Sequence, residues 1–317
     1  MKFSIIIPTY NSSNTIVRLL DSFKQTNNDF YEVIIVDDCS ADATISIVDK
    51  YKKSTDMIIR VISKEKNSGP GVSRNLGIKA ALGDYVCFMD SDDYVSNTYF
   101  SAINKGLETG AEVVYFNAYQ VTSENKSPIF SKGYKTKEDY IALTTGSLCM
   151  FCSKRSLWEG VELPPIKNAE DIAVIPVIMS RAKSIVSIPD FLYYYINNSH
   201  SLSNSYNSKI SENFIKSFHC TLSLIDRDTY AEQVEFHGIK TVLYGATLNA
   251  LKANADSVIL KKYWNSFTDQ FPKWYKSKYL SYYPVKKKFF LFMVRFRLIS
   301  LLRLYTSLHT YLLNRRK

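Results

Sequence analysis

Short apolar runs alternate with helix-patterned segments over the first hundred residues. Four runs rich in β-branched and aromatic residues predict buried strands, at Phe3–Ile7, Val33–Val36, Ile58–Ile62 and Tyr85–Met89. Continuous apolar runs of this length are typical of strands covered on both faces. A segment with apolar residues at helical spacing follows each run. The alternation predicts βαβ units in an α/β, Rossmann-like fold, with a mainly parallel sheet flanked by helices.

The pattern changes beyond residue 117. Further strands are expected at Glu112–Phe116 and Tyr193–Ile196, and a helix is expected over Asp171–Arg181. From Ser208 onward the spacing of apolar residues is helical, which predicts a mostly helical C-terminal region. We therefore divide the chain into parts at 1–117, 118–205 and 206–317.

Three carboxylates follow the fourth predicted strand, in the run Asp90-Ser91-Asp92-Asp93. In a parallel sheet, ligands bind at the carboxyl ends of the strands. Clustered carboxylates repel one another, and a divalent cation that prefers oxygen ligands, Mg²⁺ or Mn²⁺, relieves that repulsion. The alternative is a solvated acidic turn, and the position at a strand end favours the metal and diphosphate site.

Two more polar loops are expected at the same edge. Asp37 and Asp38 follow the second strand, where a carboxylate can accept hydrogen bonds from a base or a ribose, or can cap the next helix. Gly69 lies in a loop that lets backbone approach a ligand, and Arg74 just beyond it offers a fork of donors to a phosphate. The loop lacks the spacing of a Walker or dinucleotide motif.

Four segments together resemble the family-2 glycosyltransferases, which have the GT-A fold. They are Ser4–Asn11, Val33–Ser40, Asn67–Gly77 and Gly83–Asp93, and they occur in the family's order. The resemblance is strong over residues 1–117 and weaker to 205. One departure is Cys39, where the family more often has glycine or asparagine.

The resemblance implies a role for each part and for particular residues. Residues 1–117 would bind the nucleotide-sugar, 118–205 would bind the acceptor, and 206–317 would form a helical region. Asp92 would be the metal ligand. The donor would be bound by residues of the four motifs: Pro8, Tyr10, Asp38, Gly69, Arg74, Asp90 and Ser91.

Inverting sugar transfer also needs a base that deprotonates the acceptor hydroxyl. The family places it in a Glu-Asp pair at the start of a helix, and Glu170-Asp171 matches. The resemblance thus implies Asp171 as base, with Glu170 assisting or binding the acceptor. The alternative is a helix start that acidic residues stabilise. His200, in a polar loop further on, is a candidate to reach the metal.

The expected function is an inverting, metal-dependent hexosyltransferase. It would pass a hexose from a UDP-sugar to a glycan or glycolipid acceptor in lipopolysaccharide or capsule synthesis. Two alternatives remain open: a nucleotidyltransferase acting on sugar phosphates, and a catalytically silent scaffold. The first would need a glycine-rich phosphate loop after the first strand, where this chain has Pro8-Thr9-Tyr10-Asn11.

Charge is concentrated at the end of the chain. The net charge is +10, and residues 270–317 hold 12 Lys or Arg and no Asp or Glu. A neutral body with a basic aromatic tail argues against nucleic acid and favours an anionic membrane surface. Leu298, Leu301, Tyr305, Leu308 and Leu312 predict an apolar helix stripe, which would lie on the membrane, pack on the body or form a homodimer. Five cysteines and no visible signal predict a peripheral protein on the cytoplasmic face.

Overall fold

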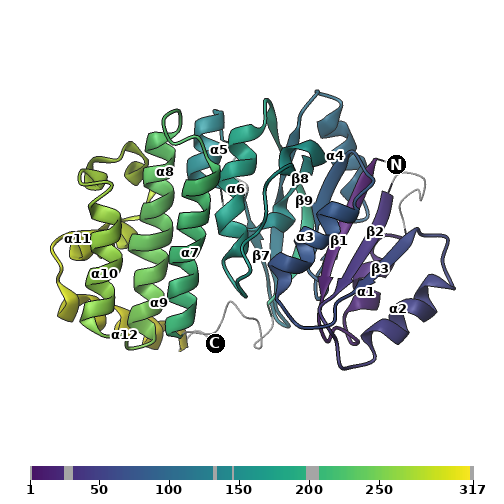
Figure 1. The fold of residues 1–317 in the computed structure, drawn as a ribbon, viewed down its shortest axis with the longest axis horizontal. Coiled ribbons are helices and arrows are strands. Elements are labelled where there is room, and N and C mark those ends of the chain that lie inside the picture. The colour runs from purple at the N-terminus through teal and green to yellow at the C-terminus, as the bar shows by residue number, and fades with distance from the viewer. Residues whose placement is uncertain (1, 25–30, 131–133, 145, 198–206, 315–317) are drawn as a thin grey trace.

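The computed structural model describes residues 2–24, 31–130, 134–144, 146–197 and 207–314. Its centre is a nine-stranded sheet with helices on both sides and a helical region at one end (Figure 1). The strands are β1 (Phe3–Thr9), β2 (Tyr31–Asp37), β3 (Ile59–Ser63), β4 (Tyr85–Phe88), β5 (Tyr94–Val95), β6 (Val113–Val121), β7 (Lys126–Ile129), β8 (Phe151–Lys154) and β9 (Ile185–Ile196).

The helices alternate with strands at first and then follow one another. They are α1 (Ile16–Asp21), α2 (Thr44–Lys52), α3 (Pro70–Ala80), α4 (Tyr99–Leu107), α5 (Lys137–Leu143), α6 (Glu170–Arg181), α7 (Ser208–Leu224), α8 (Ala231–Gly238), the π-helix η5 (Ile239–Ala246), α9 (Thr247–Lys252), α10 (Ser257–Thr268), α11 (Val285–Arg295) and α12 (Ile299–Asn314). Short 3-10 turns lie at Leu148–Met150, Arg155–Trp158, Trp274–Lys276 and Lys278–Tyr282.

The first four strands form the parallel half of the sheet, in the order β3-β2-β1-β4. Every residue of β1 and β2 is buried, which confirms the prediction of strands covered on both faces. The central β1 lies between β2 and β4. The carboxyl ends of these strands therefore meet at one edge, as right-handed crossovers require.

The second half of the sheet is mixed. β8 joins β4 antiparallel, β6 pairs antiparallel with β8 and β7, and β9 pairs parallel with β6 and antiparallel with β5. The predicted parallel sheet is thus found in full only in the N-terminal strands, where a helix returns the chain between neighbours. Beyond β4 the connections include a hairpin, β6–β7, which reverses strand direction without a crossover helix.

The helical region is attached to the sheet through α6 and α7, which stand between β8 and the remaining helices (Figure 1). The hydroxyl of Thr221 on α7 donates to the carbonyl of Ala173 on α6 at 2.8 Å. Apolar residues from Phe3 to Leu302 belong to one continuous buried core. The division near residue 205 falls among residues outside those described, and it stays a prediction.

The last two helices bury one apolar face and expose further apolar residues on another. On α11, Val285 is 81% exposed and Phe292 is 51% exposed, and on α12 the packed face carries Leu302 and Thr306. The predicted α12 stripe is divided: Leu301 and Leu308 are exposed, whereas Leu298 and Tyr305 are half-buried against the core. Periodicity identified an apolar face, but α9 and α11 contact the neighbouring one. Among the described helices, none combines the length and apolar character needed to cross a bilayer.

Candidate functional site

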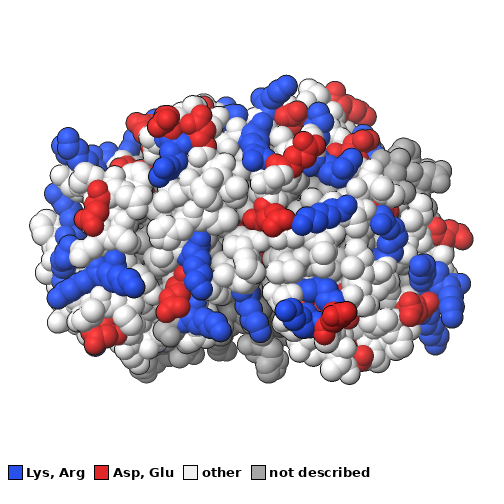
Figure 2. Space-filling view, viewed as in Figure 1, with Lys and Arg blue, Asp and Glu red and all other residues white. Residues whose placement is uncertain are grey.

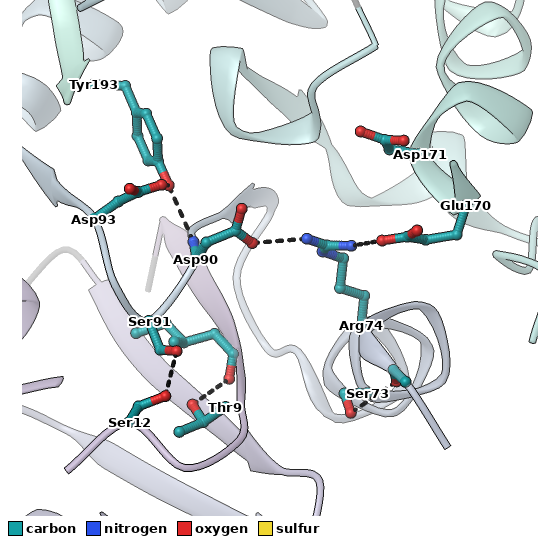
Figure 3. A network of polar contacts seen from close by, with 12 residues as sticks. Thr9, Ser12, Ser73, Arg74, Asp90, Ser91, Asp93, Glu170, Asp171 and Tyr193 are labelled. Atoms are coloured by element: carbon teal, nitrogen blue, oxygen red, sulfur yellow. Dashed lines mark hydrogen bonds and ion pairs between the residues drawn. The ribbon is translucent and has the colours of Figure 1, made fainter. Parts of the chain in front are cut away.

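The loops that follow β1, β2 and β4 are bonded to one another at the carboxyl edge of the sheet. The hydroxyls of Ser12 and Ser91 lie 2.7 Å apart, which ties the first loop to the acidic run (Figure 3). The backbone amide of Asp38 donates to the carbonyl of Thr9 at 2.7 Å. The structure thus brings together the loops that hold the predicted donor-binding residues.

Asp38 is buried and organises the loop before α3. Its carboxylate accepts hydrogen bonds from the backbone amides of Ser68 at 2.8 Å and Gly69 at 2.7 Å, and an ion pair with Lys64 at 2.5 Å. Gly69 has a φ of +90°, a backbone conformation that residues other than glycine rarely adopt. Asp38 therefore holds the Gly69 loop in its shape, in addition to any contact that it makes with a ligand.

Pro8 and Tyr10, near the end of β1, differ in how far their side chains are exposed. Pro8 is buried within β1, whereas the Tyr10 side chain is half-exposed beyond the strand end. An exposed aromatic ring at this edge is available to stack on a flat ligand.

Cys39 adopts a φ of +65°, in the left-handed region that favours glycine and asparagine. This conformation explains why the family more often has glycine or asparagine at the position of Cys39. Two hydrogen bonds across the turn hold it in place. The backbone amide of Asn11 donates to the Ser40 hydroxyl at 2.9 Å, and the backbone amide of Ala41 donates to the Asn11 side-chain oxygen at 2.9 Å.

Arg74 joins the two halves of the site. From α3 it donates to Asp90 at 2.7 Å and to Glu170 at 2.5 Å, so its guanidinium bridges carboxylates 80 residues apart (Figure 3). The charges of Asp90 and Glu170 raise the pKa of Arg74 and keep it charged despite its burial. Gly71, one turn earlier on α3, lets the helix lie close to the segment that contains Pro164. A Cβ at Gly71 would meet the Pro164 carbonyl oxygen at 2.9 Å.

Asp93, the third carboxylate of the acidic run, is bonded to β9 within the protein. It is fully buried and accepts bonds from the Tyr193 hydroxyl at 2.5 Å and the Ile196 amide at 2.7 Å, which fixes β9 against the acidic run. Burial, with the negative charges of Asp90 and Asp92, raises the pKa of Asp93 to about 8. Tyr193 also accepts from the Asp90 amide at 3.1 Å. The predicted three-carboxylate cluster therefore leaves two side chains, Asp90 and Asp92, partly exposed.

Asp90 and Asp92 are the partly exposed carboxylates of the acidic run, and they are the ones that could hold a metal ion. Oxygen ligands suit Mg²⁺ and Mn²⁺, which take their remaining ligands from water and phosphate. Among the described residues, no three His, Cys, Asp or Glu side chains converge. His200 lies outside the described residues. Arg18 donates to the Asp92 backbone carbonyl, which holds the loop in place.

Asp171 lies at the start of α6 next to Glu170, and its carboxylate is turned toward the side on which Asp90 lies (Figure 3). Burial and the charge of Glu170 raise the pKa of Asp171 to about 8, against the opposing charge of Arg74. A carboxylate with a pKa near neutrality is suited to general base chemistry. Glu170, by contrast, is committed to Arg74.

Side chains of α7 hold the backbone before Asp171, and sequence reasoning missed them. Ser217 donates to the Ala169 carbonyl at 2.6 Å, and Asn213 donates to the Asn168 side chain at 2.5 Å. Ala169 has a φ of +65°, so the turn before the predicted base is strained and held from outside. Asn75 on α3 binds both backbone groups of Leu163 at 2.9 Å.

Comparison with known proteins gives three further findings. Residues 4–157 match the model of "Glycosyl transferase family 2". A poly(ribitol-phosphate) beta-N-acetylglucosaminyltransferase, TarS, of Staphylococcus aureus is 48% identical over 30% of this chain, which is 17% of that protein. A putative teichuronic acid biosynthesis glycosyltransferase, TuaG, of Bacillus subtilis is 30% identical over 62% of this chain and 80% of its own length.

The fold has a solved counterpart. The crystal structure of S. aureus TarS 1-349 superposes with a TM-score of 0.71 and 22% identity over 98% of this chain and 92% of that chain. Its complex with UDP gives a TM-score of 0.69. The GT-A fold expected from the sequence is confirmed. The matched family model, the TuaG alignment and this fold together show that the chain belongs to glycosyl transferase family 2.

Proposed function

We propose that this protein is an inverting glycosyltransferase of cell-surface polysaccharide synthesis, which moves a sugar from a UDP-sugar to a hydroxyl of a glycan or glycolipid. The observation that carries the proposal is the Arg74 bridge, because it connects the acidic run to the residue beside Asp171. The relatives' names refer to poly(ribitol-phosphate) and to teichuronic acid biosynthesis, and TarS was crystallised with UDP. These names support the polymer class and the nucleotide.

The donor would lie along the edge formed by the β1, β2 and β4 loops. Tyr10 offers a ring for the base, the Gly69 loop that Asp38 shapes lets the backbone come close to the diphosphate, and Asp90 and Ser91 would lie at the sugar. Asp92 would hold Mg²⁺ or Mn²⁺ with Asp90. Such an ion supplies positive charge to the diphosphate as it leaves.

Asp171 would act on the acceptor. Its carboxylate removes the proton from the attacking hydroxyl, while the C–O bond to the diphosphate breaks and the new glycosidic bond forms. Glu170 and Arg74 position it: they fix the start of α6, and the buried guanidinium sets the charge around the carboxylate. Transfer in one displacement inverts the anomeric configuration.

The test is substitution of the base. Asp171→Asn keeps the shape and removes the proton acceptor, so transfer should fall about 10²–10⁴-fold. UDP release in the presence of acceptor is the measurement, with Asp190→Asn as control, since Asp190 is exposed on β9. Full activity in Asp171→Asn would refute the assignment, and so would a product with retained configuration by NMR.

The same assignment predicts the pH profile. A base acts when ionised, and the pKa of Asp171 is raised to about 8. Hence kcat/KM should rise about tenfold per pH unit below that value and level off above it. Initial rates at limiting acceptor concentration, measured from about pH 6 to about pH 9.5, check this prediction. A flat profile would contradict the base, and Asp171→Asn should abolish the slope.

We further propose that α11 and α12 contact an anionic membrane surface on the cytoplasmic side. Val285, Phe289, Phe292 and Phe296 form an exposed face of α11, and exposed Leu301, Leu304 and Leu308 continue it on α12. Figure 2 shows Lys and Arg side chains at the end of the molecule where α10 and α11 lie. Apolar faces with basic surroundings bind anionic interfaces.

Sedimentation with vesicles tests this surface. Phe289→Ser with Phe292→Ser should lower partition into phosphatidylglycerol vesicles by at least about tenfold, because two rings lose their burial. Leu82→Ser, at an exposed residue of the α3–β4 loop, is the matched control. Unchanged sedimentation would refute the surface. A dimer that the double variant dissociates, measured by light scattering, would assign the face to a second copy instead.

A further inference from the structure

A cavity of about 380 Å³ lies between α5 and α6 on one side and α8, η5 and the start of α11 on the other. Its polar lining includes Lys240, Lys287, His237 and Thr241, and the rings of Tyr244 and Tyr283 form part of its wall. Ile172, next to the proposed base, also lines it. The cavity is separate from the donor loops and has no role in the transfer described above.

The cavity is cationic. Among the described residues that line it, none is Asp or Glu. Lys240 donates to the Thr144 carbonyl at 3.2 Å, and the Lys287 ammonium lies 4.8 Å and 4.9 Å from the ring centres of Tyr244 and Tyr283. Burial and the charge of Lys287 lower the pKa of Lys240 to about 7. Two ammonium groups that repel each other in a partly desolvated space leave a place for an anion.

Two buried polar atoms strengthen this. Within the described chain, neither His237 Nδ1 nor Thr241 Oγ1 has a hydrogen-bond partner. Both residues are 2% exposed, and a buried polar group without a partner costs free energy. The cavity therefore combines positive charge with unmet hydrogen-bonding capacity.

The backbone that presents these groups is unusual. Lys240, Thr241 and Tyr244 belong to the π-helix η5 (Ile239–Ala246). π-helical turns are rare in proteins, and those that occur are frequently found at functional sites.

We propose that this cavity is a binding site for a phosphate ester, whose phosphate lies between Lys240 and Lys287. A phosphate has several oxygens for two cations and a hydroxyl donor, whereas a carboxylate has two. The volume exceeds that of a free phosphate, and the tyrosine rings offer apolar surface to the carbon skeleton of the attached group. The same chemistry is found in a soluble polyol phosphate and in a lipid headgroup.

Calorimetry of the full chain without donor tests the site directly. Glycerol 3-phosphate and inorganic phosphate are titrated, with glycerol as the uncharged comparison. Lys240→Met and Lys287→Gln should each weaken binding of the ester by at least about tenfold, because each removes a charge-assisted contact. Lys286→Gln, one residue away and exposed, should leave it unchanged. Circular dichroism of all variants shows whether they are folded.

Two arms distinguish the sources. Ester binding in solution assigns the site to a polyol phosphate. A Lys240-dependent binding to phosphatidylglycerol vesicles, absent with phosphatidylcholine and absent with glycerol 3-phosphate, assigns it to a lipid headgroup. Either result supports the phosphate ester. Equal binding of glycerol, or ester binding that is the same in Lys240→Met, Lys287→Gln and the parent, overturns the proposal, as does no binding in both arms.

Discussion

Two partly or fully buried cations, Arg74 and Lys240, have opposite surroundings. Arg74 lies between the carboxylates of Asp90 and Glu170, which raise its pKa. Lys240 faces a second ammonium, and its pKa is lowered to about 7. The first cation completes a network made by the chain itself. The second lies in a cavity whose described lining offers no carboxylate, which indicates that its complement comes from outside.

The largest effect is expected from breaking the first network. Arg74→Gln leaves the buried Glu170 carboxylate without its cation, which should cost about 3–5 kcal/mol of unfolding free energy. Urea denaturation followed by circular dichroism measures this. Lys79→Gln removes the exposed ion pair with Glu162 and should change stability by less than about 0.5 kcal/mol. Similar midpoints for the two variants would contradict the distinction drawn for Arg74.

The corresponding change in the cavity should have the opposite sign. Lys240→Met keeps the length of the side chain and removes a poorly compensated charge, so it should stabilise the protein by about 1 kcal/mol. Thermal and urea unfolding without phosphate in the buffer measure the gain. Lys286→Met is the control, because Lys286 is exposed. A destabilised Lys240→Met would mean that the folded chain already compensates this charge.

The pH dependence of that gain sharpens the comparison. Folding lowers the pKa of Lys240 from 10.5 to about 7, so between these values the unfolded chain binds more protons than the folded one. Stability contributed by this group therefore rises with pH across that window. The advantage of Lys240→Met should be greatest near pH 7 and below, and should disappear toward pH 10.5. A gain independent of pH would exclude charge as its cause.

The smallest effect concerns backbone strain rather than charge. Cys39 has a φ of +65°, and glycine adopts that conformation without steric cost, so Cys39→Gly should gain about 0.5–1 kcal/mol. Cys39→Ala keeps the Cβ and serves as the control, with no gain expected. Unfolding midpoints of both variants decide. Equal gains would contradict strain at the Cβ as the cause, because both variants also lose the hydrogen bond that the thiol donates to the Glu65 carbonyl at 3.6 Å.

The sequence was sufficient for the parts of the fold in which local pattern and motif coincide. Buried runs located β1, β2 and β4, and the polar residues after them identified the edge on which Asp38 and Asp90 lie. The resemblance to the family placed the Glu170-Asp171 pair at the start of a helix, and in the structure α6 begins at Glu170.

Long-range partners could not be predicted in the same way. Arg74 pairs with a residue 96 positions away, and Ser217 holds a carbonyl 48 positions earlier. Neither contact leaves a periodic trace, because a single hydrogen bond constrains one residue type at one place. Periodicity likewise showed that α12 has apolar faces but not which one α9 covers.

The bonds from α7 to Asn168 and Ala169 have an evolutionary consequence. Because the helical region holds the turn before Asp171, its sequence cannot be exchanged among relatives as an independent module. A chimaera that replaces α7 must also supply residues that can replace Asn213 and Ser217. Changes in α7 and changes in the turn before Asp171, the proposed base, are therefore expected to occur together.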